Sequence, residues 1–281
     1  MSLYRLEGSL PSLDGPIVIA AMDGWVDAGS AATNALAVLA DGATPIATFD
    51  ADQLYDYRSR RPTLEIRDGR LSSLAWPALV LRHARFPERD LLILTGAEPD
   101  DRWHALADAA VELMGRLDVR GWISLGAIPA AVPHTRPVPI LGTESSPGLL
   151  RGDVQAGPTG LLRVPAAALS MLEMAAAAGG IPAVGYFAQI PHYVTGPYAT
   201  AAVALLRAVE RHLDVELPRG DLSDESRALR VRLDAAAAAD ENTRAYVGRL
   251  EAMVDESRQP EGDDLITEIE RFLRDQSGGQ G

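Results

Sequence analysis

Four short segments of the chain are apolar throughout and are bounded by glycine, proline or polar residues, at residues 17–21, 91–94, 122–125 and 184–187. Continuous rather than alternating apolarity is typical of strands covered on both faces, as in a parallel sheet between helices. Weaker strand candidates occupy residues 46–49, 64–67 and 79–82. The pattern therefore predicts a sheet whose main strands are buried on both sides.

Helical periodicity lies between these strands. The clearest helix is predicted to begin at residues 98–101, where Pro99 and three acids suit a first turn. Its apolar residues then recur every three or four positions from Trp103 to Leu117. Further helices are expected from near Ser30, after Pro165 and over residues 198–213. Because strand and helix alternate, the predicted fold class is α/β.

The sequence becomes more charged after residue 218 and lacks strand patterns from there on. The predicted core domain covers residues 1–218, and residues 219–281 form a charged helical extension whose end, from Ser277, looks frayed. Two amphipathic patterns mark this extension, the first at Leu229, Leu233, Tyr246, Leu250 and Met253 and the second at Leu265, Ile269, Phe272 and Leu273. Such narrow apolar stripes need a partner surface, which is either the chain's own domain or another subunit.

Composition excludes several kinds of chemistry. All 26 basic residues are arginine, and the chain has no cysteine. Disulfides, a thiolate nucleophile and sulfur-ligated zinc are therefore excluded, and so are a Schiff base and the lysine of a P-loop or a kinase. The net charge of -13 argues against nucleic acid as a partner, because binding to a phosphate backbone would have to overcome repulsion.

The start of the sequence lacks the basic and apolar regions of a signal peptide. The most apolar long window, residues 165–190, is interrupted by Glu173 and by two glycines, so it falls short of a membrane span. We therefore expect a cytoplasmic protein that does not bind a membrane.

Polar residues follow the apolar strands, where open α/β sheets bind ligands. If the strands are parallel, these residues meet at one edge and form a candidate pocket, for which we select Asp23, Gly24, Asp27, Gly29, Thr95, Gly96, Glu98, His134, Arg136 and His192. The turn after the first strand has the glycine spacing of a P-loop, but Ser30 occupies the lysine position, which excludes a nucleotide P-loop. Two interpretations remain for this turn: Asp27 or Ser30 caps the next helix, or the turn forms a pocket wall.

Two histidines lie in proline turns, His134 in PHTRP and His192 in PHY. They are candidates for proton transfer, with Arg136 holding an anion. The alternative is that the prolines fix the path of the loops and the histidines make structural hydrogen bonds. No HExxH motif occurs, and bulky Trp122 before Ser124 defeats a nucleophile elbow. We therefore predict no metal, no cofactor and no complete catalytic signature.

Four motifs together carry a family resemblance: DGWVDAG at residues 23–29, LTGAEPD at 94–100, PHTRP at 133–137 and QIPHY at 189–193. With them, the chain resembles the proteasome assembly chaperone 2 family over about residues 15–215, in particular its actinobacterial members. The resemblance implies a three-layer α/β/α fold like that of nucleoside phosphorylases and related hydrolases. It also implies a homo-oligomer, with a trimer favoured, and proteasome core-particle subunits as partners.

One feature of the eukaryotic relatives does not carry over. Those proteins dock on the proteasome through a C-terminal motif of a hydrophobic residue, tyrosine and any residue, whereas this sequence ends Gly279-Gln280-Gly281. The leading functional hypothesis is a non-catalytic binding or assembly protein. The alternative is a small-molecule enzyme or ligand-binding protein, related to nucleosides or carboxylates, that uses the pocket at the carboxyl edge of the sheet.

Overall fold

The computed structural model describes residues 2–86, 89–152, 154–158 and 160–257. The centre of its main sheet consists of four parallel strands, which are β7 (Arg89–Ala97), β2 (Ile17–Asp23), β8 (Gly121–Ala130) and β11 (Ala183–Pro191). These strands contain the four uniformly apolar segments of the sequence, and their central residues are buried. The predicted parallel strands are therefore confirmed.

Antiparallel pairs flank this centre. Beyond β7 lie β6 (Leu79–Phe86), β3 (Thr44–Phe49) and β1 (Tyr4–Leu6). Beyond β11 lie β9 (Ile140–Glu144), which is antiparallel to β11, and β10 (Gln155–Ala156). Within the described residues the sheet is thus mixed and nine-stranded, in the order β1-β3-β6-β7-β2-β8-β11-β9-β10. β6 and β7 can only be antiparallel, because so few residues separate them along the chain.

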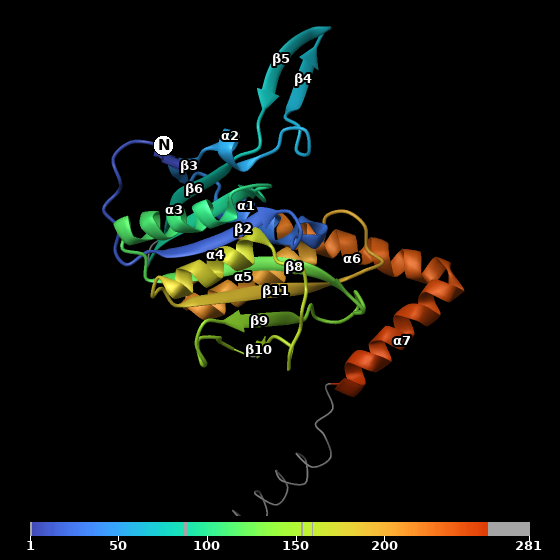
Figure 1. Cartoon of the computed structure of the whole chain (residues 1–281). Coiled ribbons are helices and arrows are strands. Elements are labelled where there is room, and N and C mark those ends of the chain that lie inside the picture. Colours follow the sequence, from blue (N-terminus) through green and yellow to red (C-terminus); the bar gives the residue numbers. More distant parts are fainter. Residues whose placement is uncertain (1, 87–88, 153, 159, 258–281) are drawn as a thin grey trace, which may run out of the picture.

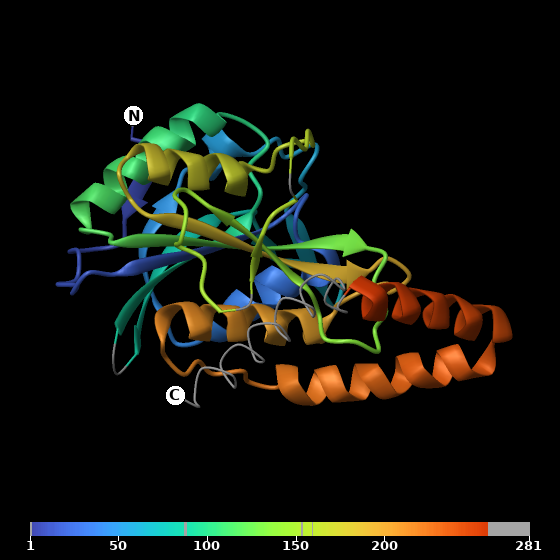
Figure 2. The ribbon, with the colours of Figure 1, turned by 90° about the horizontal axis from the view of Figure 1, so that it is seen from below.

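Helices cover both faces of the sheet (Figures 1 and 2). α1 (Ala31–Leu39) and α5 (Ala199–Leu213) lie on one face, and α3 (Trp103–Arg116) and α4 (Ala168–Ala178) lie on the other. Successive strand residues point to opposite faces, so Ile19 enters the core beneath α1 and α5 while Val18 enters the core beneath α3 and α4. The fold is α/β with three layers, as the sequence and the family resemblance imply.

α3 begins later than its sequence pattern predicts. The backbone N–H groups of Asp100 and Asp101 donate to the carbonyl of Leu54, at 2.9 and 3.1 Å, and so fix this segment against the short helix α2 (Ala51–Leu54). Arg102 then adopts a left-handed φ of 60°, and the helix starts at Trp103. The predicted first turn is thus a loop, because the left-handed backbone at Arg102 separates it from the helix.

The segment from residue 57 to residue 76 leaves the sheet altogether. It forms a hairpin of β4 (Thr63–Arg67) and β5 (Arg70–Ala75), whose residues are all exposed. Figure 1 shows this hairpin projecting from the body of the molecule. Residues 64–67 are therefore a strand, as predicted, but they contribute nothing to the main sheet.

The C-terminal extension forms two helices, α6 (Leu222–Ala239) and α7 (Glu241–Ser257), which lie side by side in Figure 2. Leu222 of α6 is buried in the core beneath α5, and Leu229 and Leu233 pack against the same core. The α6 part of the first amphipathic pattern thus packs on the chain's own domain. In α7, Leu250 is buried, whereas Met253 is 58% exposed. The second pattern, Leu265 to Leu273, and the predicted frayed end lie outside the described residues. Among the described helices, none combines the length and the apolarity needed to cross a membrane.

Candidate functional site

Glu98 lies at the carboxyl edge of the sheet and joins three elements. Its carboxylate accepts hydrogen bonds from the backbone N–H of Trp25, after β2, and of Ala168, at the start of α4, at 2.9 and 2.8 Å. Its own N–H donates to the carbonyl of Asp23 at 2.9 Å. A Cβ at Gly24 would collide with the Glu98 side chain, so glycine is required there. The structure thus brings Asp23, Gly24 and Glu98 together, with the carboxylate of Glu98 engaged by backbone donors.

Thr95 and Gly96 hold β7 against β6. Arg82 of β6 donates to Thr95 Oγ1 at 3.0 Å. A Cβ at Gly96 would collide with the carbonyl of Ala78, so this position must also be glycine. These two predicted site residues therefore have evident roles in the contact between strands.

Asp27 caps helix α1. Its Oδ1 accepts hydrogen bonds from the backbone N–H of Ala32 at 2.8 Å and of Thr33 at 3.3 Å, and its Oδ2 accepts from the Thr33 hydroxyl. Burial raises the pKa of Asp27, and these hydrogen bonds offset part of that rise. Of the two interpretations of the first turn, the structure therefore contains the helix cap.

Gly29 lies in the same turn with a φ of 60°, a left-handed conformation that favours glycine. A Cβ at Gly29 would also come within 2.9 Å of Cβ of Tyr198, next to the start of α5. The backbone N–H of Tyr198 donates to the Gly29 carbonyl at 2.9 Å. The turn is thus packed tightly against the segment that follows β11.

The two proline turns meet at Tyr193. The hydroxyl of Tyr193 accepts a hydrogen bond from the His134 backbone N–H at 2.8 Å and lies 2.8 Å from His134 Nδ1. The rings of His134 and His192 both stand edge-on to the Tyr193 ring, with centroids 5.8 and 5.7 Å away. The structure therefore brings the two predicted histidines to the same place, although not to an open pocket.

His134 also contacts helix α6. Its Nε2 lies 3.2 Å from Asp234 Oδ1, and its carbonyl accepts a hydrogen bond from Arg230 at 2.8 Å. Because the Tyr193 hydroxyl already accepts from the backbone, its proton is free to point to Nδ1, which leaves Nε2 as the donor to Asp234. Burial, aided by Arg230, lowers the pKa of His134, and Asp234 opposes this only in part. The neutral histidine is therefore favoured.

Arg136 is paired by helix α7. Its Nε and Nη2 donate to the two carboxylate oxygens of Asp255 at 2.9 and 2.7 Å, and its Nη1 donates to Glu251 at 3.1 Å. The Thr135 hydroxyl donates to the same Glu251 oxygen. These carboxylates raise the pKa of Arg136. The anion predicted to bind Arg136 is thus supplied by the chain itself.

His192 completes the contact with α7. Its Nε2 lies 3.1 Å from the hydroxyl of Tyr246, and its Nδ1 lies 3.1 Å from the carbonyl of Ala130. We call this set of side chains the turn–arm cluster; it consists of His134, Arg136, His192, Tyr193, Asp234, Tyr246, Glu251 and Asp255. The cluster joins the loops after β8 and β11 to the two C-terminal helices.

The predicted site residues therefore divide into two groups with different contacts. One group, which fixes the turns around β2, β7 and α1, consists of Asp23, Gly24, Asp27, Gly29, Thr95, Gly96 and Glu98. The other group, which contacts α6 and α7, consists of His134, Arg136 and His192. Sequence reasoning missed the acidic partners Asp234, Glu251 and Asp255. The spacing of four between Glu251 and Asp255 puts both on one face of a helix, and this was the available signal, but nothing local to that helix points to Arg136.

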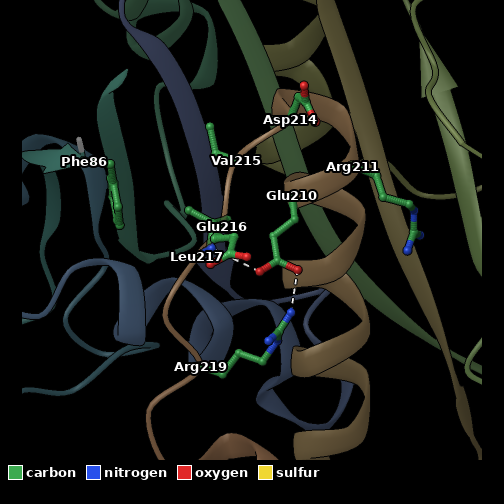
Figure 3. A pocket seen from close by; sticks show the side chains of 8 residues that line it. All are labelled: Phe86, Glu210, Arg211, Asp214, Val215, Glu216, Leu217 and Arg219. Atoms are coloured by element: carbon green, nitrogen blue, oxygen red, sulfur yellow. Dashed lines mark hydrogen bonds and ion pairs between the residues drawn. The ribbon is translucent and has the colours of Figure 1, made fainter. Parts of the chain in front are cut away.

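A cavity of about 780 Å³ lies at the opposite edge of the sheet, near the amino end of β7 (Figure 3). It is lined mainly by the end of α5 and the residues that follow, with Phe86 on another side. Glu210 accepts hydrogen bonds there from Arg219 at 2.6 Å and from the Leu217 N–H at 3.0 Å. This cavity is separate from the predicted pocket, because the predicted residues lie at or after the carboxyl ends of the strands.

The chain resembles several proteins of known structure. A Corynebacterium glutamicum protein of unknown function is 32% identical, with a TM-score of 0.84 over 91% of this chain and 98% of that chain. A Mycobacterium tuberculosis proteasome-assembly chaperone homologue is 38% identical, with a TM-score of 0.75 over 82% and 99%. A PAC2 family protein from Streptomyces avermitilis is 34% identical, with a TM-score of 0.74 over 83% and 99%.

Among curated proteins, none matches this chain. A profile of the PAC2 family matches residues 21–237, which include every residue of the predicted pocket. The match extends into α6 as far as residue 237 and includes Asp234, so the part of the helix that contacts His134 belongs to the shared sequence. The chain therefore belongs to the PAC2 family.

Proposed function

We propose that this chain is a non-catalytic, cytoplasmic protein-binding protein that acts as a homotrimer in the assembly of proteasome core particles. Two findings support the proposal: the chain belongs to the PAC2 family, and it is similar to a protein described as a proteasome-assembly chaperone homologue. The core-particle subunits are the partners that this likeness favours.

The pairing of Arg136 with Asp255 and Glu251 is the observation that carries the non-catalytic part of this proposal. A guanidinium that is to bind a substrate anion needs free donors, but three donors of Arg136 are used by α7. The neighbouring His134 is buried and bonded on both ring nitrogens. The residues best suited to chemistry are thus used to hold helices in place.

The alternative, a small-molecule enzyme at the carboxyl edge, has less support. Two of its three acidic candidates, Asp27 and Glu98, accept hydrogen bonds from backbone donors of the chain. The third, Asp23, is exposed and lies 3.6 Å from Arg60. A general base must reach the proton that it abstracts, and carboxylates that already accept hydrogen bonds from the backbone are poorly placed for that task.

The test is purification of the tagged chain from its source cell at native abundance, followed by identification of the proteins bound to it. The proposal predicts recovery of α- and β-type subunits of the proteasome core particle. The same tag on an unrelated acidic protein of similar size is the control, because it reports non-specific binding. Absence of core-particle subunits from the tagged chain would contradict the proposal.

A second measurement addresses assembly itself. Purified core-particle subunits are mixed with and without the chain, and half-particles and full particles are followed by native gel over time. We expect the chain to increase the yield or rate of assembly without being consumed. Identical time courses would show that binding, if present, serves another purpose.

A further inference from the structure

The β4–β5 hairpin has one apolar face. Its register places Leu64 opposite Leu74 and Ile66 opposite Leu71, so the four aliphatic side chains lie on the same side of the two strands. All four are exposed, Leu64 by 44%, Leu74 by 52%, Ile66 by 61% and Leu71 by 75%. The other face carries Glu65 opposite Ser73 and Arg67 opposite Arg70. The hairpin thus has one apolar and one polar face, as a sheet does when it covers a core. Within the described residues, however, no helix or strand covers its apolar face.

An isolated hairpin of two strands is marginally stable in water, because it buries little apolar surface. A contiguous apolar face on a projecting element is also a typical sign of protein association. The hairpin therefore requires a partner surface, and the partner must be apolar where it meets the four aliphatic side chains.

The charge of the hairpin narrows the choice of partner. Residues 57–76 contain five arginines, which are Arg58, Arg60, Arg61, Arg67 and Arg70, but only two acids, Glu65 and Asp68. The whole chain has a net charge of -13, so the rest of the molecule is strongly acidic. A basic hairpin on an acidic body is complementary to another copy of the same molecule.

A suitable recess lies beside β1. It has a volume of about 830 Å³, and it is lined by the aromatic side chains Tyr4, Phe49, Tyr57 and Trp76 together with Asp50 and Asp52. Tyr57 and Trp76 pack edge to face with ring centroids 4.7 Å apart and form part of its wall. The recess thus offers aromatic surface to an apolar face. Its two carboxylates accept hydrogen bonds within the chain, Asp50 from Gln53 and Asp52 from Tyr57, and Arg5 lines the same recess, so its main contribution is apolar contact.

β1 adds a second reason for choosing this recess. It is the last strand at its end of the described sheet, and its three residues leave one side unpaired. An edge strand of this kind accepts an incoming strand through main-chain hydrogen bonds. A hairpin that enters the recess would cover this edge as well as the aromatic wall.

We propose that the apolar face of the β4–β5 hairpin docks in the aromatic recess beside β1 of a second copy of this chain. The hairpin projects from the body of the molecule (Figure 1), and the recess lies at its base, where Tyr57 and Trp76 form one wall. The contact joins different surfaces on the two copies, and its repetition around one axis, with a rotation that closes, builds a closed oligomer. This inference goes beyond the proposed function, because it names the surfaces that join the copies and holds whether or not proteasome subunits bind.

The decisive experiment uses one variant of each surface. Leu74→Asp places a carboxylate on the apolar face of the hairpin, and Ala51→Arg places a bulky cation in the recess. We expect each variant to be monomeric by light scattering at micromolar concentration, whereas the unaltered chain forms an oligomer. An equimolar mixture of the two variants should form a dimer, because one intact hairpin and one intact recess remain in the pair.

Matched controls separate docking from folding. Ser73→Asp adds the same charge to the opposite face of β5, and Asp41→Arg adds a cation at an exposed turn after α1. Both should assemble like the unaltered chain. Far-ultraviolet circular dichroism and the unfolding midpoint are measured for all four variants. The midpoint should be unchanged in Leu74→Asp, because Leu74 is exposed, whereas Ala51 is half-buried beside the core beneath α3 and α4, so Ala51→Arg should lower the midpoint slightly and keep the native circular dichroism.

Three outcomes would overturn the proposal. Assembly of Leu74→Asp would show that the hairpin is not the contact. Assembly of Ala51→Arg would show that the hairpin docks elsewhere, for example on another hairpin. A mixture that remains monomeric would exclude a head-to-tail contact.

The absence of native cysteine allows an independent check. The single variants Leu74→Cys and Ala51→Cys are mixed and oxidised, and a disulfide-linked dimer should form in the mixture far more than in either variant alone. Linking in the Leu74→Cys sample alone would instead indicate contact between two hairpins. An oligomer that forms through this contact but does not bind proteasome subunits would contradict the proposed function and leave the present inference intact.

Discussion

Arg136 and Asp255 form a two-pronged ion pair that joins the loop after β8 to helix α7, with Nε–Oδ1 and Nη2–Oδ2 distances of 2.9 and 2.7 Å. The two residues are far apart in sequence. Their pairing replaces the expected role of Arg136 in binding an external anion with a role in positioning the C-terminal helices.

The first prediction concerns this pair. Asp255→Ala should loosen α7, because Arg136 then keeps only Glu251 as a partner. Hydrogen exchange in α7 should accelerate by less than about tenfold, since an ion pair of this exposure is partly screened by solvent. Glu256→Ala, at the next and exposed position, should leave the exchange unchanged. Equal exchange in both variants would show that the ion pair does not hold the helix.

The second prediction concerns ligands of Arg136. Inorganic phosphate at millimolar concentration should produce no Arg136-dependent rise in the unfolding temperature, because the guanidinium is already paired. A rise in the unaltered chain that Arg136→Ala abolishes would restore the anion-binding hypothesis, since ligand stabilisation grows with concentration over the dissociation constant.

The third prediction concerns pH and His134. Burial lowers the pKa of this histidine in the folded state, so the unfolded chain binds the proton more readily. The free energy of unfolding should therefore fall as the pH drops below about 6.5, the ordinary histidine pKa. His134→Gln should reduce this dependence, while His104→Gln, at an exposed position on α3, should not. Urea unfolding at several pH values measures the slopes, and equal slopes for both variants would contradict the prediction.

The fourth prediction concerns Glu173 on α4. Burial raises the pKa of this carboxyl group, and the hydrogen bonds with Thr143, which donates to Oε1 at 2.6 Å, and with Ser124 offset only part of that rise. Stability should therefore decrease as the pH rises from the unfolded pKa of the group toward its higher folded pKa. Glu173→Gln should remove this loss and stabilise the chain by about 1 kcal/mol at neutral pH.

The control for Glu173 is Glu256→Gln, an exposed position on α7. It should show little change at any pH. If Glu173→Gln destabilises the chain at neutral pH, the ionised carboxylate is required, and a role for the buried charge would have to be sought.

The fifth prediction concerns the cap of α1. Asp27→Ala should destabilise the chain by about 1 to 2 kcal/mol, because the N–H groups of Ala32 and Thr33 lose their acceptor. Asp27→Asn should recover much of this loss, since it keeps one carbonyl oxygen. Chemical denaturation measures both changes. An alanine variant as stable as the unaltered chain would show that the cap contributes little.

The sequence was most informative about the middle of the sheet. Nearly uniform apolarity at residues 17–21 and 122–125 predicts strands buried on both faces, because a polar side chain is tolerated there only with a buried partner. Ser124, for example, accepts a hydrogen bond from Trp122 Nε1 at 2.8 Å. The same reasoning could not place residues 64–67, whose alternating pattern fits any half-exposed strand. Whether such a strand joins a sheet or projects depends on contacts that the local pattern does not contain.

The candidate site shows the same limit. Proline and glycine in the turns correctly marked positions with strict geometric demands, such as Gly24 beside Glu98. The partners of His134 and Arg136 could not be found, because they lie about a hundred residues further along the chain on helices whose apolar stripe gives no sign of their polar contacts.

The assignment of neighbouring β2 residues to opposite cores has a consequence for unfolding. Val18 and Ile19 are adjacent in the chain but belong to different helical layers, so neither layer can be lost without exposing the strand that supports the other. The two layers should therefore unfold in a single cooperative transition, as domains with a shared sheet commonly do. A substitution at Glu173, on α4 in one helical layer, would then change the rate of hydrogen exchange in α1, in the other layer, although α4 and α1 lie on opposite faces of the sheet.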